Sequence, residues 1–389
     1  MKFLHLADLH LGKTMEGHSR LEDQAEVLAK VVELCQERQV DAVLVAGDIY
    51  DTKKLDRGAL NLFEKFITDL ATNQIKAYII AGNHDEKDLL DYGKSFFQAD
   101  GIHIVGEYKG SIQKEVFHDE FGAVNIYLLP YVKKSEIYNA FPEKMEEFGN
   151  SYNLGLEYVL NREEVDETAR NIILSHQFVA ATTKKTRQAG SEGNFEANRR
   201  ALDEVGTIEK ISAKIYAKFD YVALGHLHLS DSLDSEKMRY AGSLMKYHRD
   251  EKEKAFPLVT LGAKGTEPVV ELVEIRPSRD IEIIRGELAE LLKQPLNENY
   301  IYVELLDTMR QINVRERLRA VFPNFMKATY VNEIAGSQES TQAIFNTAEK
   351  TFEELASDFY RYVYNEAITD EELAILRELA EECGISNVE

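Results

Sequence analysis

The chain opens with Phe3-Leu4-His5-Leu6-Ala7-Asp8-Leu9-His10, a short apolar run that ends in an Asp-X-His triplet. An apolar run of this length, bounded by a polar residue, is typical of a buried strand. Residues 41–46 and 77–81 are two similar runs, and residues 21–38 and 59–72 between them place apolar side chains at helical spacing. This alternation predicts an α/β protein in which helices cover a mostly parallel sheet.

The remaining chain divides by composition. Further apolar runs predict strands at residues 124–129, 171–174, 221–224, 258–261 and 267–275. Arg276-Pro277-Ser278-Arg279-Asp280 then interrupts the pattern, so we expect a domain boundary there. The expected parts are a first domain over 1–275, a smaller α/β domain over 276–334, a linker over 335–350 and a helical segment over 351–389.

The last segment is acidic and amphipathic. Capping boxes begin at Thr351 and Thr369, which predicts two short helices. These helices either pack on their own domain or dock a partner protein.

Charge and cysteine content exclude several classes of protein. The 389 residues include 46 Lys and Arg against 68 Asp and Glu, a net charge of -22, which excludes a uniformly basic nucleic-acid binder. A DNA substrate stays possible, because bound metals and local basic patches supply positive charge. Basic residues gather at 184–200 and 309–327, as substrate contacts or as solvated surface. Only two cysteines, no apolar span and no signal peptide lead us to expect a cytoplasmic protein without membrane contact.

Polar side chains follow five of the predicted strands directly. Because ligands bind at the carboxyl ends of parallel strands, we expect these side chains to converge at one sheet edge. Their Asp, Asn and His donors suit manganese, iron or zinc, and Asp48 is placed to bridge two ions. Each motif alone is also typical of a turn. The candidate metal ligands are Asp8, His10, Asp48, Asn83, His176, His226 and His228.

In this order, Asp-X-His, Gly-Asp, Gly-Asn-His-Asp, Ser-His and Gly-His-Leu-His resemble the calcineurin-like metallophosphoesterase superfamily. Within it, four stretches resemble the SbcD family of bacterial nuclease subunits: residues 7–13, 219–228, 240–243 and 276–280. The resemblance implies a β-sandwich flanked by helices, followed by an α/β cap (DNA-recognition) domain and C-terminal helices.

The resemblance also implies roles for the candidate residues. One Mn²⁺ or other divalent ion would be held by Asp8, His10, Asp48 and His228, and a second by Asp48, Asn83, His176 and His226. His84 would be the catalytic histidine, which protonates the leaving 3′ oxygen or stabilises the transition state, and Asp85 would orient its ring. Archaeal relatives often have a further histidine where this chain has Asp51. Asp51 would either support a metal ligand or only form a turn.

The implied activity is a manganese-dependent DNA nuclease with 3′-to-5′ exonuclease and endonuclease action on double-stranded ends and hairpins, in DNA repair, recombination and replication. An SbcC-type ATPase partner would bind residues 351–389, and a homodimer would form through helices near residues 58–98. Two alternatives remain: a phosphomonoesterase or nucleotide hydrolase on the same fold, and a scaffold without catalytic activity.

Overall fold

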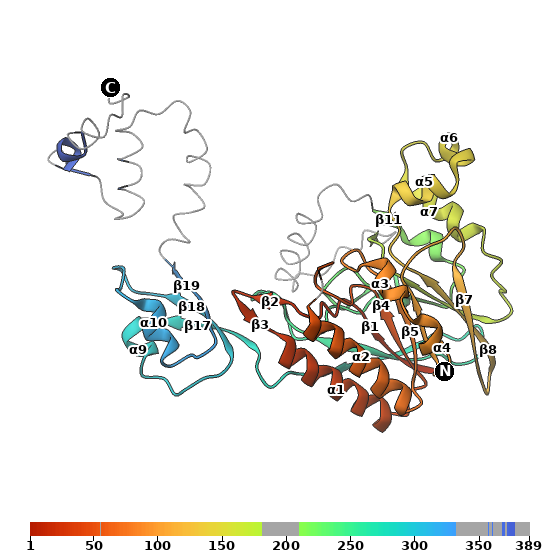
Figure 1. Cartoon of the computed structure of the whole chain (residues 1–389), viewed down its shortest axis with the longest axis horizontal. Helices are drawn as coiled ribbons and strands as arrows, with labels where there is room; N and C mark the ends of the chain where they lie inside the picture. The colour runs from red at the N-terminus through yellow and green to blue at the C-terminus, as the bar shows by residue number, and fades with distance from the viewer. Residues whose placement is uncertain are drawn as a thin grey trace. The chain divides into compact units, whose positions relative to one another are not determined.

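A computed structural model gives the fold of residues 1–54, 56–180 and 210–331, together with residues 357, 360, 368–369 and 372–377 (Figure 1). The basic stretch 184–200, the predicted linker 335–350 and most of the predicted helical segment 351–389 lie outside the described residues. Within that segment residues 372–377 are helical, and the Thr369 capping box is confirmed. The Thr369 backbone N–H donates to Glu372 Oε2 at 3.0 Å, and the Glu372 N–H donates to Thr369 Oγ1 at 3.3 Å.

The first sheet has six strands in the order β16-β15-β1-β4-β5-β6. The four strands from the start of the chain are parallel, and a hairpin from later in the chain adds two antiparallel strands at one edge. The strands are β1 (Lys2–Leu6), β4 (Ala42–Ala46), β5 (Lys76–Ile80), β6 (Ile102–Val105), β15 (Ala255–Thr260) and β16 (Val269–Glu274).

The second sheet has six strands in the order β13-β14-β12-β9-β8-β7. Its central strands are parallel, and the outer strands β7 and β13 are antiparallel to their neighbours. The strands are β7 (Gln113–Asp119), β8 (Gly122–Leu129), β9 (Arg170–Ser175), β12 (Tyr221–Leu224), β13 (Asp231–Leu233) and β14 (Ser235–Tyr240).

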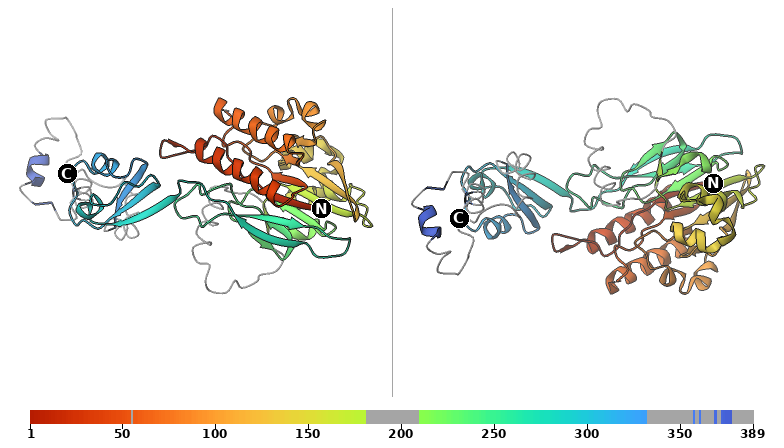
Figure 2. Two further views of the ribbon diagram at one scale, coloured as in Figure 1. Left: turned by 90° about the horizontal axis from the view of Figure 1, so that it is seen from below. Right: turned by 90° about the horizontal axis from the view of Figure 1, so that it is seen from above.

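The two sheets face each other across a buried core and carry helices on their outer faces. Apolar side chains of both sheets fill the space between them, including Leu44 and Tyr78 of the first and Ile126 and Leu174 of the second. Helices α1 (Leu21–Glu37) and α2 (Arg57–Thr72) cover the first sheet (Figures 1 and 2). Helices α5 (Lys134–Ala140), α6 (Met145–Phe148) and α7 (Tyr152–Asn161) cover the second. This arrangement confirms the β-sandwich flanked by helices.

Helix α1 shows why the sequence pattern gives this layer. Val27, Leu28, Val31, Val32 and Cys35 form its buried stripe, and its charged residues face solvent, apart from the buried Asp23. Burial raises the pKa of the Cys35 thiol to about 12, so this cysteine packs in the core and is not a nucleophile.

Later residues form a third, three-stranded sheet of β17 (Ile281–Gly286), β18 (Tyr300–Leu305) and β19 (Phe325–Tyr330), in that order, with helices α9 (Leu288–Leu291) and α10 (Val314–Arg319). The chain divides into two compact units: residues 1–283, 295–302 and 318–327 form one, and the described remainder from 284 onward forms the other. The domain boundary at residue 276 stays a prediction.

Shorter elements connect these layers. They are β2 (Thr14–Met15), β3 (His18–Ser19), β10 (Val179–Ala180), β11 (Ile211–Ser212), α3 (Lys87–Asp91), α4 (Lys94–Gln98), and the 3₁₀ turns η1 (Pro142–Lys144) and η2 (Ala213–Tyr216). Across the described ranges, no helix combines the length and apolar character that a membrane span requires.

Candidate metal centre

All seven predicted ligands lie just beyond the carboxyl ends of strands, but these strands belong to two sheets. The first sheet supplies Asp8 and His10 after β1, Asp48 after β4 and Asn83 after β5. The second supplies His176 after β9, and His226 and His228 after β12. The expectation of one sheet edge is therefore wrong, because the ligands meet across the end of the sandwich.

The side chains of these residues form two adjoining groups of donor atoms. Asp8, His10 and His228 form one, and Asp8, Asp48 and His176 form the other, each with ligand atoms within 4.8 Å of one another. Asn83 Oδ1 lies 3.2 Å from His176 Nε2 and 3.0 Å from His226 Nδ1. The arrangement brings all seven predicted ligands into one cluster.

Asp8 belongs to both groups. Asp48, a member of the second group, also approaches a histidine of the first. Its Oδ2 atom is 3.3 Å from His176 Nε2 and 3.8 Å from His10 Nε2. Its other carboxylate oxygen, Oδ1, accepts a hydrogen bond from the backbone N–H of His84 at 2.9 Å. One carboxylate thus contacts histidines from both sheets.

The backbone at the cluster is strained. Asp8, His10, Asp48 and His226 all have positive φ, at 51°, 44°, 52° and 89°. Residues other than glycine rarely adopt this conformation, and such residues concentrate at functional sites. The backbone N–H of His226 donates to both Asp8 carboxylate oxygens, at 3.0 and 3.1 Å, which helps to hold the two loops together.

Three glycines allow the strand ends to approach this closely. A Cβ atom at Gly47 would lie 2.3 Å from His176 Nδ1, and one at Gly82 would lie 2.1 Å from Asp48 Oδ1. A Cβ atom at Gly225 would lie 2.0 Å from the Ala46 carbonyl oxygen. Each glycine directly precedes a candidate ligand, so close approach of backbone and side chain explains the Gly-Asp, Gly-Asn and Gly-His motifs.

The cluster concentrates negative charge in a buried place. Asp8 and Asp48 are buried, and no lysine or arginine of the described residues pairs with either carboxylate. Burial raises the pKa of Asp8. Burial acts in the same direction on Asp48, but the neighbouring His176 outweighs it and the pKa of Asp48 is lowered. Two buried carboxylates whose charged neighbours are only histidines form a site that favours a bound cation.

The histidines differ in charge. Burial lowers the pKa of His176, but Asp48 outweighs this effect and raises it to about 9. Burial and the neighbouring His176 lower the pKa of His226 to about 3, so this ring is neutral and offers a lone pair. Carboxylate, imidazole and amide donors with no thiolate fit Mn²⁺, Fe²⁺ or Zn²⁺.

His84 is the exposed member of the cluster. Its ring packs edge-on against His10, with centroids 4.9 Å apart, and its Nδ1 lies 2.7 Å from the Asp51 carbonyl oxygen. Nδ1 therefore donates to the carbonyl, and Nε2 is left as the second nitrogen of the ring.

Asp85 does not orient the His84 ring as expected. Its buried carboxylate accepts backbone N–H bonds from Gly82 at 2.8 Å, Tyr50 at 2.9 Å and Ile49 at 3.1 Å. It ties the loop after β4 to the loop after β5 and thereby fixes the segment that carries Asn83 and His84. Burial and the nearby Asp48 raise the pKa of Asp85 to about 6.

Three more residues support the cluster, and of these only Asp51 is singled out by the sequence. Asp51 Oδ1 lies 3.4 Å from His10 Nδ1 and 2.8 Å from Lys13 Nζ. Gln24 on α1 donates to the His10 carbonyl at 2.7 Å, and Glu251 Oε1 lies 3.5 Å from His228 Nδ1. Gln24 and Glu251 follow no predicted strand, so the strand-end pattern gives no signal for them.

The chain belongs to the calcineurin-like phosphoesterase family, whose profile matches residues 1–230 and thus more than half of its 389 residues. This membership makes it a hydrolase of phosphoesters that depends on divalent metal ions. Residues 277–364 match a second profile, SbcD_C, described as the type 5 capsule protein repressor C-terminal domain. The resemblance to SbcD nuclease subunits is thereby confirmed.

Solved structures show distant likeness. A dimetal phosphatase from Danio rerio is 15% identical, covering 69% of this chain and 98% of its own, with a TM-score of 0.38. GAP50, the anchor in the inner membrane complex of Plasmodium, is 11% identical, with a TM-score of 0.39. The match covers 85% of this chain and 96% of GAP50. TT1561 of Thermus thermophilus is 12% identical, with a TM-score of 0.35. The match covers 66% of this chain and 92% of TT1561. At these scores the likeness carries no functional information.

Proposed function

We propose that the protein is a cytoplasmic DNA nuclease, the SbcD-like subunit of an SbcCD-like complex. It would cleave phosphodiesters at double-stranded ends and hairpins, as a 3′-to-5′ exonuclease and an endonuclease, in DNA repair, recombination and replication. The observation that carries this proposal is the combination of two features in one chain: a cluster of metal donors beside an exposed histidine, and a C-terminal match to the SbcD_C profile.

In this proposal Asp8, His10, Asp48 and His228 hold one Mn²⁺, and Asp48, Asn83, His176 and His226 hold the other. When bound, two divalent cations would supply positive charge to a phosphodiester and would lower the pKa of water. The supporting geometry is the approach of one Asp48 oxygen to His10 at 3.8 Å and to His176 at 3.3 Å, two histidines that the proposal assigns to different ions.

His84 is the proposed proton donor. The bond from its Nδ1 to the Asp51 carbonyl fixes the ring, and its exposed edge is open to a substrate. From this position Nε2 protonates the leaving 3′ oxygen as the phosphodiester breaks, a step typically worth 10²–10⁴-fold in rate. Asp85 serves as a positioning residue, because it holds the loop on which His84 lies.

The cap domain supplies a DNA contact in this proposal. Helix α10 buries Leu318 and exposes Arg315, Arg317 and Arg319. Three exposed guanidinium groups on one short helix are suited to the phosphates of a duplex, and their contribution would fall steeply with salt.

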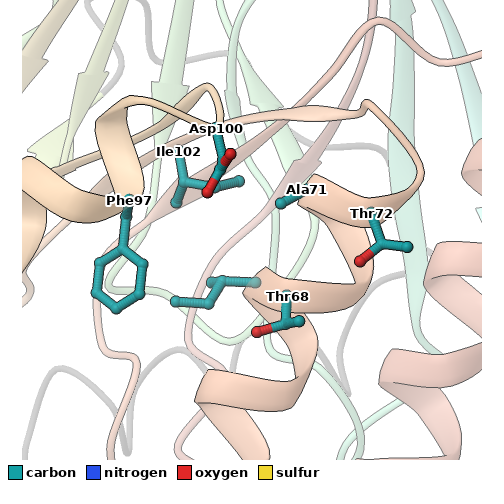
Figure 3. Close-up of a pocket in the computed structure, with 7 residues that line it drawn as sticks. Thr68, Ala71, Thr72, Phe97, Asp100 and Ile102 are labelled. Carbon is teal, nitrogen blue, oxygen red and sulfur yellow. The ribbon is translucent and has the colours of Figure 1, made fainter.

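Two protein partners complete the proposal. An SbcC-type ATPase would bind the C-terminal segment 351–389, within the acidic part of the chain. A second copy would pack on α2, α3 and α4, where Tyr92 and Phe96 are 82% and 79% exposed. A cavity of about 300 Å³ between α2 and β6 is lined by Thr68 and by Phe97, the next residue after Phe96, among others (Figure 3). Exposed aromatic rings next to a recess are typical of a protein interface.

A nuclease assay tests the central proposal. The purified protein is incubated with linear double-stranded DNA and Mn²⁺, with EDTA as the metal-free control. We expect DNA degradation that His84→Ala lowers by 10²–10⁴-fold while metal content, measured by mass spectrometry, is unchanged. The matched control is His118→Ala, which removes an exposed histidine from β7.

Two outcomes would overturn the proposal. Rapid hydrolysis of phosphomonoesters without any DNA cleavage, with and without an SbcC-type partner, would favour the phosphomonoesterase or nucleotide hydrolase. Two bound metals with no turnover of any phosphoester would favour the scaffold.

A further inference from the structure

A buried ion pair lies beside the candidate ligand His228. Glu251 and Lys254, in the segment between β14 and β15, are 7% and 9% exposed, with Oε2 and Nζ 2.5 Å apart. Burying two charges has a desolvation cost that even a well-formed ion pair only partly offsets. We therefore asked what this pair does for the neighbouring His228.

The pair holds His228 at both its ring and its backbone. Glu251 Oε1 lies 3.5 Å from His228 Nδ1, and Lys254 Nζ donates to the His228 carbonyl oxygen at 2.6 Å. Glu251 Oε2 also accepts the Tyr247 backbone N–H at 3.3 Å, whereas Oε1 has no hydrogen-bond partner within the described part of the chain. The unsatisfied oxygen therefore faces the His228 Nδ1 atom, and a ring nitrogen of the exposed His248 lies within 4.8 Å of the same carboxylate.

The position of this oxygen determines how His228 uses its two nitrogens. Nδ1 faces Glu251, and Nε2 faces His10 Nε2 at 3.0 Å. A carboxylate that faces one imidazole nitrogen keeps the proton there and leaves the lone pair on the other nitrogen. We propose that Glu251, neutralised by Lys254, is the positioning residue that fixes His228 as an Nε2 ligand. This inference rests on the proposed metal centre.

The other histidines show which ion the pair serves. His10 has a similar support, because Asp51 Oδ1 lies between His10 Nδ1 and Lys13 Nζ. His176 instead has its Nδ1 2.6 Å from the neutral carbonyl oxygen of Ala46. Carboxylate–lysine support is thus found at the two histidines proposed for one ion, and loss of Glu251 should weaken that ion selectively.

The test is titration of the metal-free full chain with Mn²⁺ by isothermal calorimetry. For Glu251→Gln we expect one of the two Mn²⁺ affinities to fall by about 10–100-fold and the other to stay unchanged. The matched control is Glu253→Gln, two residues along, whose side chain is 46% exposed and pairs with Lys246. It should bind both ions as the unaltered chain does.

Because Glu251→Gln leaves Lys254 buried without its carboxylate partner, a double variant Glu251→Gln/Lys254→Met removes both charges and is expected to fold. Melting temperature and circular dichroism establish that each variant is folded. Nitrogen NMR of the metal-free chain with ¹⁵N-labelled histidine gives a second readout. The His228 proton should leave Nδ1 in the two Glu251 variants but stay there in the unaltered chain and in Glu253→Gln.

The outcomes separate this inference from the proposed function. If the unaltered chain binds no Mn²⁺, the metal centre itself is wrong. If the unaltered chain binds two ions and the folded variants bind both with unchanged affinity, or lose both equally, the role of Glu251 is wrong and the metal centre stands.

Discussion

The Nε2 atoms of His10 and His228 lie 3.0 Å apart although 218 residues separate them in the chain. His10 follows a strand of the first sheet, and His228 follows a strand of the second. Both are aromatic nitrogens, so at this distance they either share a proton or share a cation. A cation bound here would join the two sheets.

Divalent metal is therefore expected to stabilise the fold. At a free Mn²⁺ concentration 100 times the Kd, binding to the native state alone contributes about 2.7 kcal/mol. We expect the melting temperature to rise with Mn²⁺ and to fall with EDTA, as measured by differential scanning calorimetry. His10→Ala and His228→Ala should reduce the shift and His118→Ala should keep it. Equal shifts in all three variants would contradict a metal bridge between the sheets.

The position of Asp48 predicts a difference in metal stoichiometry between two carboxylates. Asp48 approaches both His10 and His176, which the proposal assigns to different ions, whereas the proposal assigns Asp8 to one ion only. We expect Asp48→Asn to lose both ions and Asp8→Asn to lose one, as counted by mass spectrometry after dialysis. Retention of two ions in Asp48→Asn would show that the carboxylate is not shared.

Gly47 and Gly122 form a matched pair for testing the close approach at the cluster. Their φ angles are +92° and +97°, but a Cβ atom at Gly47 meets His176 at 2.3 Å whereas one at Gly122 meets nothing within 4 Å. Alanine should cost about 1–2 kcal/mol at either position for the backbone conformation alone. At Gly47 we expect roughly 1–3 kcal/mol more from the clash, together with weaker Mn²⁺ binding. Chemical denaturation measures the stability and calorimetric titration the binding, and equal losses at the two positions would contradict the steric argument.

His5 predicts a pH dependence of stability that is independent of the metal. The ring is buried, its Nδ1 lies 3.1 Å from the Tyr221 hydroxyl, and burial and the charge of Arg239 lower its pKa from 6.5 to about 3. Between these pH values the unfolded chain binds a proton that the folded chain does not. The free energy of unfolding should therefore fall by up to about 1.4 kcal/mol per pH unit as the pH drops from 6.5 toward 3.

His5→Asn keeps a polar group toward Tyr221 but cannot titrate. The free energy of unfolding is measured in urea with EDTA at about pH 7, 6 and 5. Its slope against pH should be shallower for the variant than for the unaltered chain, by the amount that corresponds to about one bound proton. Parallel curves would show that His5 is not buried as a neutral ring.

Much of the fold follows from local pattern. The strands at residues 42–46 and 221–224 and the helix at 21–37 are confirmed within a few residues, because apolar runs and helical stripes report burial directly. The sheet that each strand joins, in contrast, does not follow from local pattern. The central strands of both sheets, such as β4, β9 and β12, are buried on both faces and read as equally apolar, so pairing depends on packing between distant segments. For this reason the sequence predicts ligands at the edge of one sheet, whereas the structure places them at the ends of strands from two sheets.

The candidate site divides in the same way. Its seven donors are visible in the sequence because each lies just after a strand, and Asp48, Asn83 and His226 also directly follow a glycine. The partner of the His84 ring was not visible, since a backbone carbonyl at Asp51 serves instead of the Asp85 carboxylate. Glu251 lies beyond His228 in a segment without regular pattern, and only the folded chain brings the two together.

The division of the donors between two sheets sets an order of events during synthesis. A chain that ends before residue 170 carries Asp8, His10, Asp48 and Asn83 but none of the three histidines that follow β9 and β12. Neither proposed ion then has its full set of donors. Hydrolysis that depends on the cluster can begin only after both sheets have been made and have closed on each other. Unfinished chains and proteolytic fragments that lack either set of donors would therefore be inert toward phosphoesters.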